Sequence, residues 1–255
     1  MAKNKAALAA ALLLTGSLAA LPALFLARGR AARSLPPSSF AAASAPARAA
    51  QAPAAGPGSA AAQDWQTRLV SAAHPLPEDF SVCTAPVEHY PDRRFDARAV
   101  DALNALLDGA QKAGLPLYLV SAWRSPARQQ ALFARKVAWY LRRGYDGGAA
   151  ERQAARWVAR PGTSEHNLGL AADLVSARWY ENHDDLTEEF AATPEYAWLC
   201  AHCAEYGFVL RYPPGKAQLT GVTYEPWHFR YVGRRAAQLL TSQGLCLEEL
   251  PGQTR

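Results

Sequence analysis

Residues 164–176 read SEHNLGLAADLVS and join a polar beginning to an apolar second half. The apolar run over residues 168–176 is short and predicts a buried β-strand. Asp173 lies inside this run, where an ionised carboxylate is costly unless it is paired or bound to a metal ion. His166 precedes the strand in a segment that we expect to be a loop, and Gly169 predicts either a turn or a close backbone approach. The stretch therefore predicts a strand that carries a polar site into the core.

A second stretch, TYEPWHFRYVG at residues 223–233, places Glu225 and His228 three positions apart among aromatic residues. A single histidine or aspartate in a strand is more often a hydrogen-bonded core residue than a metal ligand. Together, however, His166, Asp173 and His228 would supply two imidazole nitrogens and one carboxylate, which leaves a fourth position on Zn²⁺ for water. Glu225 lies outside this set and could take a proton from that water. The spacing leaves both a zinc hydrolase and a group of core polar residues open.

Helix and strand patterns alternate along residues 64–255. Residues 96–114 predict an amphipathic helix with Asp96 as its N-cap and Gly114 as its stop. The apolar face of that helix would consist of Val100, Leu103, Leu106, Leu107 and Ala110. Further helices are expected at 125–144, 149–159, 194–206 and 234–244, and strands at 115–123, 168–176, 208–212 and 227–233. This order predicts one α+β domain.

The first 63 residues differ in composition from the rest, with six basic residues and no acidic residue. The remainder holds 21 basic and 22 acidic residues, so no folded basic face favours a nucleic-acid partner. Residues 1–33 contain an apolar run at 6–27 after two lysines, which predicts a signal peptide or a retained membrane anchor. Residues 34–63 are rich in Ala, Pro and Ser and predict a disordered linker. We expect an extracytoplasmic domain, either secreted or tethered to the membrane through residues 6–27.

The cysteines are Cys83, Cys200, Cys203 and Cys246. In an oxidising compartment they could form up to two disulfides, with three alternative pairings. The CAHC sequence at 200–203 lies within the helix expected at 194–206, where Thr193 can cap, and no second CxxC completes a zinc knuckle. We therefore expect structural disulfides or buried thiols rather than a metal or redox site.

Three stretches together resemble the VanY-type D-alanyl-D-alanine carboxypeptidases, which are zinc metallopeptidases. SEHNLGLAAD at 164–173 is similar to that family's SxHxxGxAxD signature, and EPWHFRYVG at 225–233 to its ExxH-containing signature. SAWRSPARQQALF at 121–133 is similar to its YRSxxxQxxLF segment, and the resemblance covers roughly residues 75–250. Trp123 stands where the family usually has tyrosine, which keeps an aromatic wall but loses a hydroxyl.

The resemblance implies a fold and a set of residue roles. The fold would be a small antiparallel sheet with flanking helices, of the hedgehog/D-Ala-D-Ala peptidase type. His166, Asp173 and His228 would hold Zn²⁺, and Glu225 would act as general base and then as general acid. Arg124 would stabilise the developing oxyanion. The residues that would contact substrate are Ser164, Gln129 and Trp227.

The implied activity is a D,D-carboxypeptidase that removes the C-terminal D-alanine from peptidoglycan stem peptides, acting as a monomer. An L,D-carboxypeptidase or an endopeptidase on peptidoglycan would use the same chemistry. A non-catalytic cell-wall-binding module is the alternative from another class. Serine chemistry is not expected, because the chain contains no GxSxG sequence.

Overall fold

The computed structural model describes residues 65–183, 185–251 and 253. The signal peptide or anchor predicted at 1–33 and the linker predicted at 34–63 lie outside the described residues. Within the described ranges, no helix has both the length and the apolar character needed to cross a membrane.

Four antiparallel strands form the central sheet, in the order β3 (Leu117–Ser121), β4 (Ala171–Ser176), β6 (His228–Tyr231) and β5 (Phe208–Leu210). All four coincide with strands expected from the sequence, although each is shorter. In the register of the sheet, Asp173 on β4 pairs with His228 on β6 and with Ser121 on β3. Two polar residues 55 positions apart in the sequence are thus brought side by side by strand pairing. The sheet itself positions the candidate site.

A two-stranded hairpin, β1 (Thr84–Val87) and β2 (Tyr90–Asp96), was not predicted. It corrects the N-cap assigned to the first helix, α1, which spans Val100–Lys112 and has Ala99 at its N-cap position. Asp96 instead ends β2, where its backbone pairs with Thr84. Its carboxylate accepts hydrogen bonds from the backbone and side chain of Arg98, so it is not available to cap α1.

The main core lies where the sheet packs with α1 and α6 (Pro194–His202). The predicted apolar face of α1 is confirmed, because all of its members are buried: Val100, Leu103, Leu106, Leu107 and Ala110. A second core joins α8 (Arg234–Gln243) to β5 and to the turn η3 (Leu247–Glu249). Thr193 caps α6 as predicted, since its side chain accepts a hydrogen bond from the backbone N–H of Tyr196.

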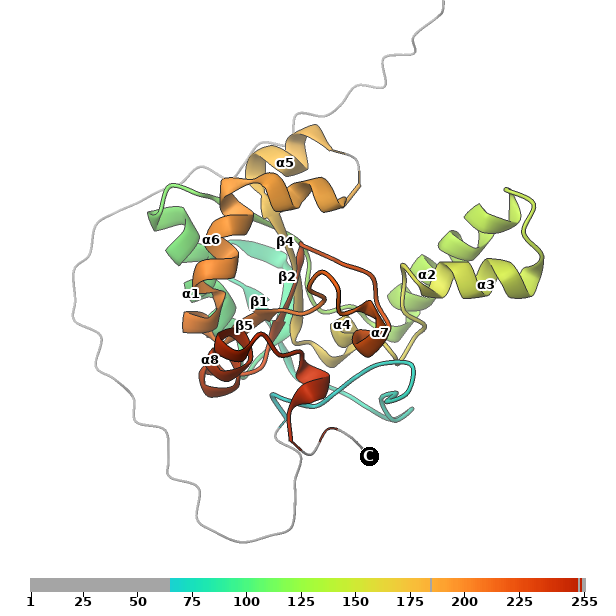
Figure 1. The fold of residues 1–255 in the computed structure, drawn as a ribbon, viewed down its shortest axis with the longest axis horizontal. Coiled ribbons are helices and arrows are strands. Elements are labelled where there is room, and N and C mark those ends of the chain that lie inside the picture. Colours follow the sequence, from blue (N-terminus) through green and yellow to red (C-terminus); the bar gives the residue numbers. More distant parts are fainter. Residues whose placement is uncertain (1–64, 184, 252, 254–255) are drawn as a thin grey trace, which may run out of the picture. The chain divides into compact units, whose positions relative to one another are not determined.

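The helices α2 (Pro126–Leu141) and α3 (Gly147–Ala155) form a hairpin that extends away from the sheet (Figure 1). Ser125, where the predicted helix 125–144 starts, is the N-cap of α2, and its side chain accepts a hydrogen bond from the N–H of Arg128; the helix ends at Leu141, before the predicted Gly144. The hairpin has a small core of its own, made of Phe133, Tyr140, Ala150 and Ala154. The helix α3 ends at Ala155, earlier than predicted. Residues 156–159 are therefore not part of the helix, and they line a pocket.

Short elements complete the domain. These are α4 (Glu165–Leu168), α5 (Ala177–Asn182), α7 (Ala217–Thr220), and the 3-10 turns η1 (Glu188–Ala192) and η2 (Cys203–Tyr206). The segment around His166 is therefore a single helical turn, not a loop. Ser164 caps it, and Gly169 ends it in the left-handed conformation with φ of +88°. The four cysteines are free thiols in this structure, with Cys203 and Cys246 buried and Cys83 exposed.

Candidate metal centre and catalytic pocket

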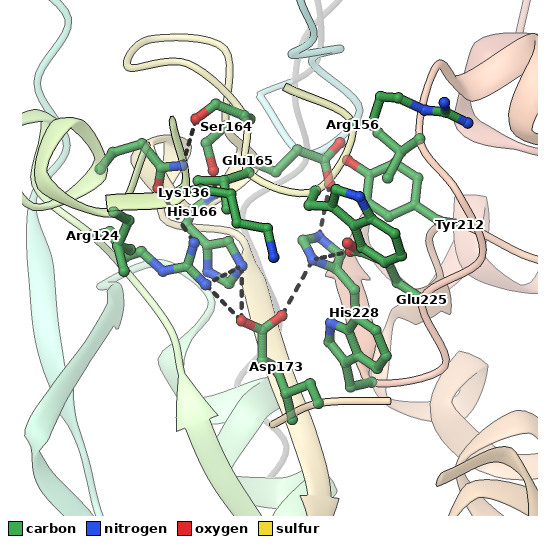
Figure 2. Close-up of a pocket in the computed structure, with 18 of the residues that line it drawn as sticks. Arg124, Lys136, Arg156, Ser164, Glu165, His166, Asp173, Tyr212, Glu225 and His228 are labelled. Atoms are coloured by element: carbon green, nitrogen blue, oxygen red, sulfur yellow. Dashed lines mark hydrogen bonds and ion pairs between the residues drawn. The ribbon is translucent and has the colours of Figure 1, made fainter. Parts of the chain in front are cut away.

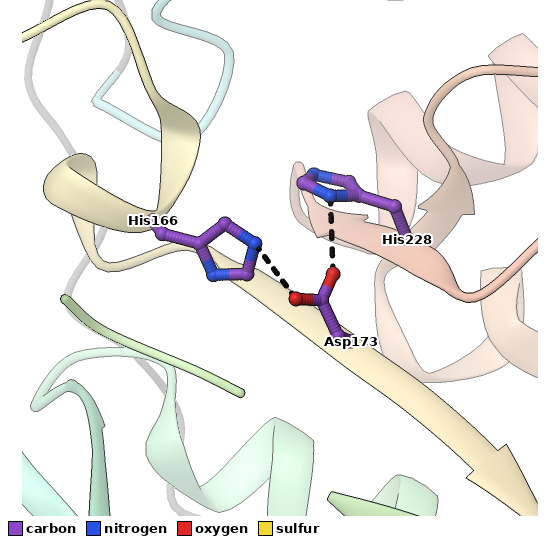
Figure 3. A group of neighbouring side chains, drawn as sticks. All are labelled: His166, Asp173 and His228. Atoms are coloured by element: carbon purple, nitrogen blue, oxygen red, sulfur yellow. Dashed lines mark ion pairs between the residues drawn. The ribbon is translucent and has the colours of Figure 1, made fainter. Parts of the chain in front are cut away.

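Two buried histidine side chains, His166 and His228, converge at the buried carboxylate of Asp173 (Figure 3). Nε2 of His166 lies 3.2 Å from Oδ2 of Asp173, and Nδ1 of His228 lies 3.3 Å from Oδ1. One ligand atom from each of the three lies within 4.8 Å of the other two. Oδ1 of Asp173 is buried without a hydrogen-bond partner among the described residues. The two nitrogens and one carboxylate form a donor set that fits Zn²⁺.

His166 is held in the tautomer that a metal ion needs. Its Nδ1 lies 2.7 Å from the carbonyl oxygen of Ala122, which can only accept, so Nδ1 carries the proton and donates. The unprotonated Nε2 then accepts a hydrogen bond from Nη2 of Arg124 at 3.1 Å and lies 3.2 Å from Oδ2 of Asp173. Burial and the nearby charge of Arg124 lower the pKa of His166 to about 4, so the ring is neutral at pH 7. Neutral imidazole is the form that binds metals.

The charges around His228 favour its protonated form, in contrast to those around His166. Burial alone would lower its pKa, but contacts with the carboxylates of Asp173 and Glu165 raise the pKa to about 9. The ring lies between these two acids, since Nε2 is 3.5 Å from Oε2 of Glu165. In the absence of a metal ion His228 is therefore protonated at pH 7, and ligation through Nδ1 requires that proton to leave.

Glu225 lies at the entrance to β6, beside the three converging side chains. Its Oε2 is 3.5 Å from Nδ1 of His228, and its backbone N–H donates to the carbonyl of Tyr212. Burial raises the pKa of Glu225 to about 7, opposed by the charge of His228. A carboxylate with a pKa near neutrality can both accept and return a proton at working pH.

Arg124 also contacts the carboxylate of Asp173 (Figure 2). Its Nη2 donates to Oδ2 of Asp173 at 2.6 Å, and its Nε donates to the Ser121 hydroxyl at 2.7 Å. Gln129 is 1% exposed and is engaged at both ends, accepting from Arg124 and donating to the carbonyl of Ala159. The structure thus shows Gln129 orienting Arg124, while its predicted contact with substrate stays a prediction.

A pocket of about 380 Å³ contains all of the predicted site residues in its lining. Ser164 and Trp227 are both buried and both line it. The Ser164 hydroxyl caps α4, and Trp227 also packs in the main core, so each has a structural role beside the predicted contact with substrate. Tyr212, which was not predicted, faces His228 with 4.8 Å between the ring centroids.

Glu165 is the most important residue near the site that was not predicted from the sequence. Its side chain is fully buried, and Oε1 accepts hydrogen bonds from Arg211 and Arg230, each at 2.7 Å. Burial alone would raise the pKa of Glu165, but these two guanidinium groups outweigh it and lower the pKa well below its usual range. Among the described residues Oε2 has no hydrogen-bond partner, and it lies 3.5 Å from Nε2 of His228. A carboxylate of this kind fixes the orientation of a metal-binding imidazole.

Comparison with known proteins agrees with this geometry. A family model described as VanY, D-alanyl-D-alanine carboxypeptidase, matches residues 92–234, which is more than half of the chain. The chain belongs to the VanY family. A relative in Enterococcus faecalis, a D-alanyl-D-alanine carboxypeptidase, is 38% identical over 187 residues, covering 73% of this chain and 66% of the relative. The chain spans at most about two thirds of the length of the curated relatives that it matches.

Solved VanY-family structures share the fold. A VanY D,D-pentapeptidase variant in complex with Zn(II) is 38% identical, with a TM-score of 0.63, and the match covers 73% of this chain and 98% of that one. VanYB in complex with D-alanine-D-alanine is 38% identical, with a TM-score of 0.65, and covers 75% and 100%. The L,D-carboxypeptidase LdcB is 35% identical, with a TM-score of 0.59, and covers 73% and 86%. The α+β fold expected from the sequence is confirmed.

A signal for the missed residues was present in the sequence of this VanY-family chain. Arg211 follows the apolar run FVL, and Arg230 stands inside the strand HFRY. A charge inside an apolar strand drew attention to Asp173, and the same criterion would have selected both arginines. Their partner, Glu165, could not be identified in this way, because it lies 46 and 65 positions away from them along the chain.

Proposed function

We propose that this chain is a zinc-dependent D,D-carboxypeptidase that removes the C-terminal D-alanine from peptidoglycan stem peptides. The observation that carries the proposal is the convergence of His166, Asp173 and His228 in a pocket that also contains Glu225 and Arg124. Bound by these three side chains, Zn²⁺ would supply Lewis acidity to the attacking water and to the scissile carbonyl.

Glu225 is the proton carrier of the proposed reaction. Its carboxylate stands beside the three converging side chains without belonging to them, and burial places its pKa near 7. It would accept a proton as water attacks and return it to the departing amine. Arg124 would place a fixed positive charge near the developing oxyanion, because Ser121 and Gln129 hold its guanidinium in place.

The substrate class follows from the family. The Enterococcus faecalis relative is a D-alanyl-D-alanine carboxypeptidase, and a solved relative binds D-alanine-D-alanine. The similarity to LdcB favours an L,D-carboxypeptidase as the second candidate, because that activity uses the same fold. Tetrapeptide stems would then be the substrate instead of pentapeptide stems. A peptidoglycan endopeptidase would keep the same chemistry on a cross-link.

Export fits a peptidoglycan substrate. Residues 1–33 carry the signal or anchor pattern, and residues 34–63 have the composition of a tether. We propose that the domain works as a monomer outside the cytoplasmic membrane, released or held through residues 6–27. Proteolytic mapping of the mature N-terminus in cell fractions tests this, since an intact N-terminus in a soluble cytoplasmic fraction would contradict export.

The activity is tested by incubating the protein with defined pentapeptide and tetrapeptide stems and weighing the products. We expect loss of one alanine from the pentapeptide, inhibition by a chelator, and stoichiometric zinc by elemental analysis. Glu225→Ala should abolish turnover while zinc remains bound. Cleavage of the tetrapeptide alone would establish the L,D-carboxypeptidase, and absence of both zinc and turnover would contradict the proposal and favour a non-catalytic wall-binding module.

A further inference from the structure

The α2–α3 hairpin differs in charge from the rest of the folded chain. Residues 126–160 hold eight basic and two acidic residues, whereas the remainder of residues 64–255 holds 13 basic and 20 acidic residues. The hairpin thus has a net charge of +6 and the rest of the domain a net charge of −7. The nearly neutral total for the domain conceals this separation. The hairpin is a cationic projection on an anionic domain.

The two acidic residues of the hairpin leave most of its positive charge uncompensated. Glu151 is paired with Arg160 at 2.9 Å, and the Asp146 carboxylate caps α3 by accepting a backbone hydrogen bond at 2.7 Å. Arg142 and Arg143 are exposed between the two helices, and neither forms an ion pair within the described ranges. With Asp146 counted, residues 141–146 keep one net positive charge. The other exposed arginines of the hairpin without an ion pair in the described part of the chain are Arg128, Arg135, Arg152 and Arg156.

The end of the hairpin also exposes apolar side chains. Leu141, the last residue of α2, is 46% exposed, and Tyr145, in the connection to α3, is 42% exposed. Among the described residues five large apolar side chains are exposed, and three of them belong to the hairpin, the third being Trp157. Apolar side chains gathered at one exposed place indicate an interaction site. We refer to Leu141, Arg142, Arg143 and Tyr145 as the hairpin tip.

Aromatic residues beneath the hairpin tip hold it in shape. The guanidinium carbon of Arg143 lies 3.2 Å from the ring centroid of Trp139. The Tyr145 ring packs edge to face against Tyr140, with 5.3 Å between centroids, and Tyr140 is buried in the small core of the hairpin. Side chains that are already held in place lose less conformational entropy when they contact a partner.

The place of the hairpin tip indicates what kind of partner it meets. The hairpin extends away from the sheet, so its tip can contact a flat surface in front of the domain, whereas a flexible anionic polymer requires no projection (Figure 1). Arginines beside aromatic and aliphatic side chains suit the interface of an anionic bilayer, because the arginines attract phosphate headgroups and the apolar groups enter the acyl boundary. The same surface would repel the negative charge of the rest of the domain, which orients the hairpin toward it.

We propose that the hairpin tip, with the exposed arginines of α2 and α3, docks this domain on an anionic lipid surface. The contact is peripheral and separate from the apolar run at 6–27, and it does not depend on the activity proposed above. Leu132 and residues 155–159 of the same hairpin line the catalytic pocket. Docking would therefore hold the pocket close to the membrane and present it to peptides near that surface.

The test measures backbone hydrogen exchange in the full chain, mixed either with phosphatidylcholine vesicles or with vesicles of phosphatidylcholine and phosphatidylglycerol. The apolar run at 6–27 is expected to bind both kinds of vesicle, so total binding does not report on the hairpin. Exchange at residues 139–148 does report on it, with α8 as the internal reference. Inorganic polyphosphate serves as a soluble polyanion for comparison.

A pair of charge variants separates the hairpin tip from other basic surface. Arg142→Gln with Arg143→Gln removes two adjacent arginines from the tip. Arg234→Gln with Arg235→Gln is the matched control, because it removes two adjacent exposed arginines at the beginning of α8. None of the four residues lines the catalytic pocket, and Tm is measured for each protein to show that the fold is retained.

Anionic vesicles should slow exchange at residues 139–148 by at least about fivefold, because each arginine near an anionic surface contributes roughly that factor to binding. High salt should reverse the effect, and phosphatidylcholine alone should leave exchange unchanged. The variant at Arg142 and Arg143 should lose the protection, while the control keeps it. Unchanged exchange with anionic vesicles, or equal slowing by both kinds of vesicle, would overturn the proposal.

The apolar side chains of the hairpin tip distinguish a bilayer from a soluble polyanion. Leu141→Ser with Tyr145→Ser should weaken the protection by anionic vesicles, whereas Leu239→Ser, at an exposed leucine of α8, should not. If polyphosphate protects residues 139–148 as strongly as the vesicles do, and the variant at Leu141 and Tyr145 is protected as well as the wild type, the surface binds polyanions and membrane docking is refuted.

Discussion

Replacing Glu165 by glutamine should weaken zinc binding without removing any of the three converging side chains. The carboxylate oxygen Oε2 lies 3.5 Å from Nε2 of His228, so it fixes the ring and favours a proton on that nitrogen. Loss of such an outer contact typically costs about 10–100-fold in metal affinity. Because 3.5 Å is longer than a normal hydrogen bond, we expect the lower end, about tenfold, which is about 1.4 kcal/mol.

Glu165→Gln should also lower the stability of the fold, so the measurement of zinc affinity needs a control variant. With glutamine at position 165, the buried guanidinium of Arg230 loses its carboxylate and keeps only neutral acceptors, the glutamine amide oxygen and backbone carbonyls, and breaking a buried ion pair typically costs about 3–5 kcal/mol. Glu248→Gln also removes a carboxylate from this network, at Arg211, but Glu248 has no contact with His228 among the described interactions. Its Tm should fall while its zinc affinity stays within about twofold of wild type.

Competition with a chromogenic chelator gives the zinc Kd of each protein at a temperature where all are folded. Glu165→Asp is a further variant, because it keeps the charge beside the arginines but shortens the reach to His228. It should weaken zinc binding with a smaller loss of Tm. If Glu165→Gln binds zinc as tightly as Glu248→Gln, Glu165 serves the fold alone and the reasoning is wrong.

Two further predictions follow from the geometry. Zinc binding at pH 7 should release about one proton, because the pKa of His228 is near 9 without metal and that of His166 is near 4. The affinity should therefore rise as pH increases toward 9, and calorimetry in buffers of different ionisation heat counts the proton; zero release would contradict the assignment. Gly207→Ala should cost about 2 kcal/mol or more in urea unfolding, because φ is +88° and a Cβ would lie 2.8 Å from the Tyr231 ring. Gly215→Ala has a φ of +78° in open space and should cost only about 1 kcal/mol, so equal losses would refute the steric argument.

The sequence predicted the helices and strands in which apolar residues recur with a clear period. The helix α1 shows a 3.6-residue apolar repeat, and its whole predicted face is buried. The β1–β2 hairpin was not predicted, because β2 has the sequence YPDRRFD and only its last two residues are buried. Three of its seven residues are exposed and two more are only partly buried, so no apolar alternation marks it as a strand. The helix α4 is a single turn, which is too short for any period to appear.

The candidate site was predictable where a polar residue stands alone in an apolar strand. Asp173 and His228 have this property, and strand register places them opposite each other. The surroundings of His228 were not predictable, because Glu165 approaches it from another element. The presence of Lys136 and Arg156 in the pocket lining was not predictable either, since a lysine or arginine is mostly a surface residue and only the tertiary fold places it at a pocket.

The guanidinium of Arg230 has a consequence for how small an active version of this domain can be. Its Nη2 donates to the carbonyls of Gln66 and Arg68, and the neighbouring Arg211 is paired with Glu248. These partners lie outside residues 92–234, the part that matches the family model. A chain trimmed to the residues that match the family model would keep every candidate metal ligand. It would lose the residues that hold the two buried arginines in place. The smallest self-sufficient unit is therefore set by the ends of this charge network, near residue 66 and residue 248, rather than by the signature motifs.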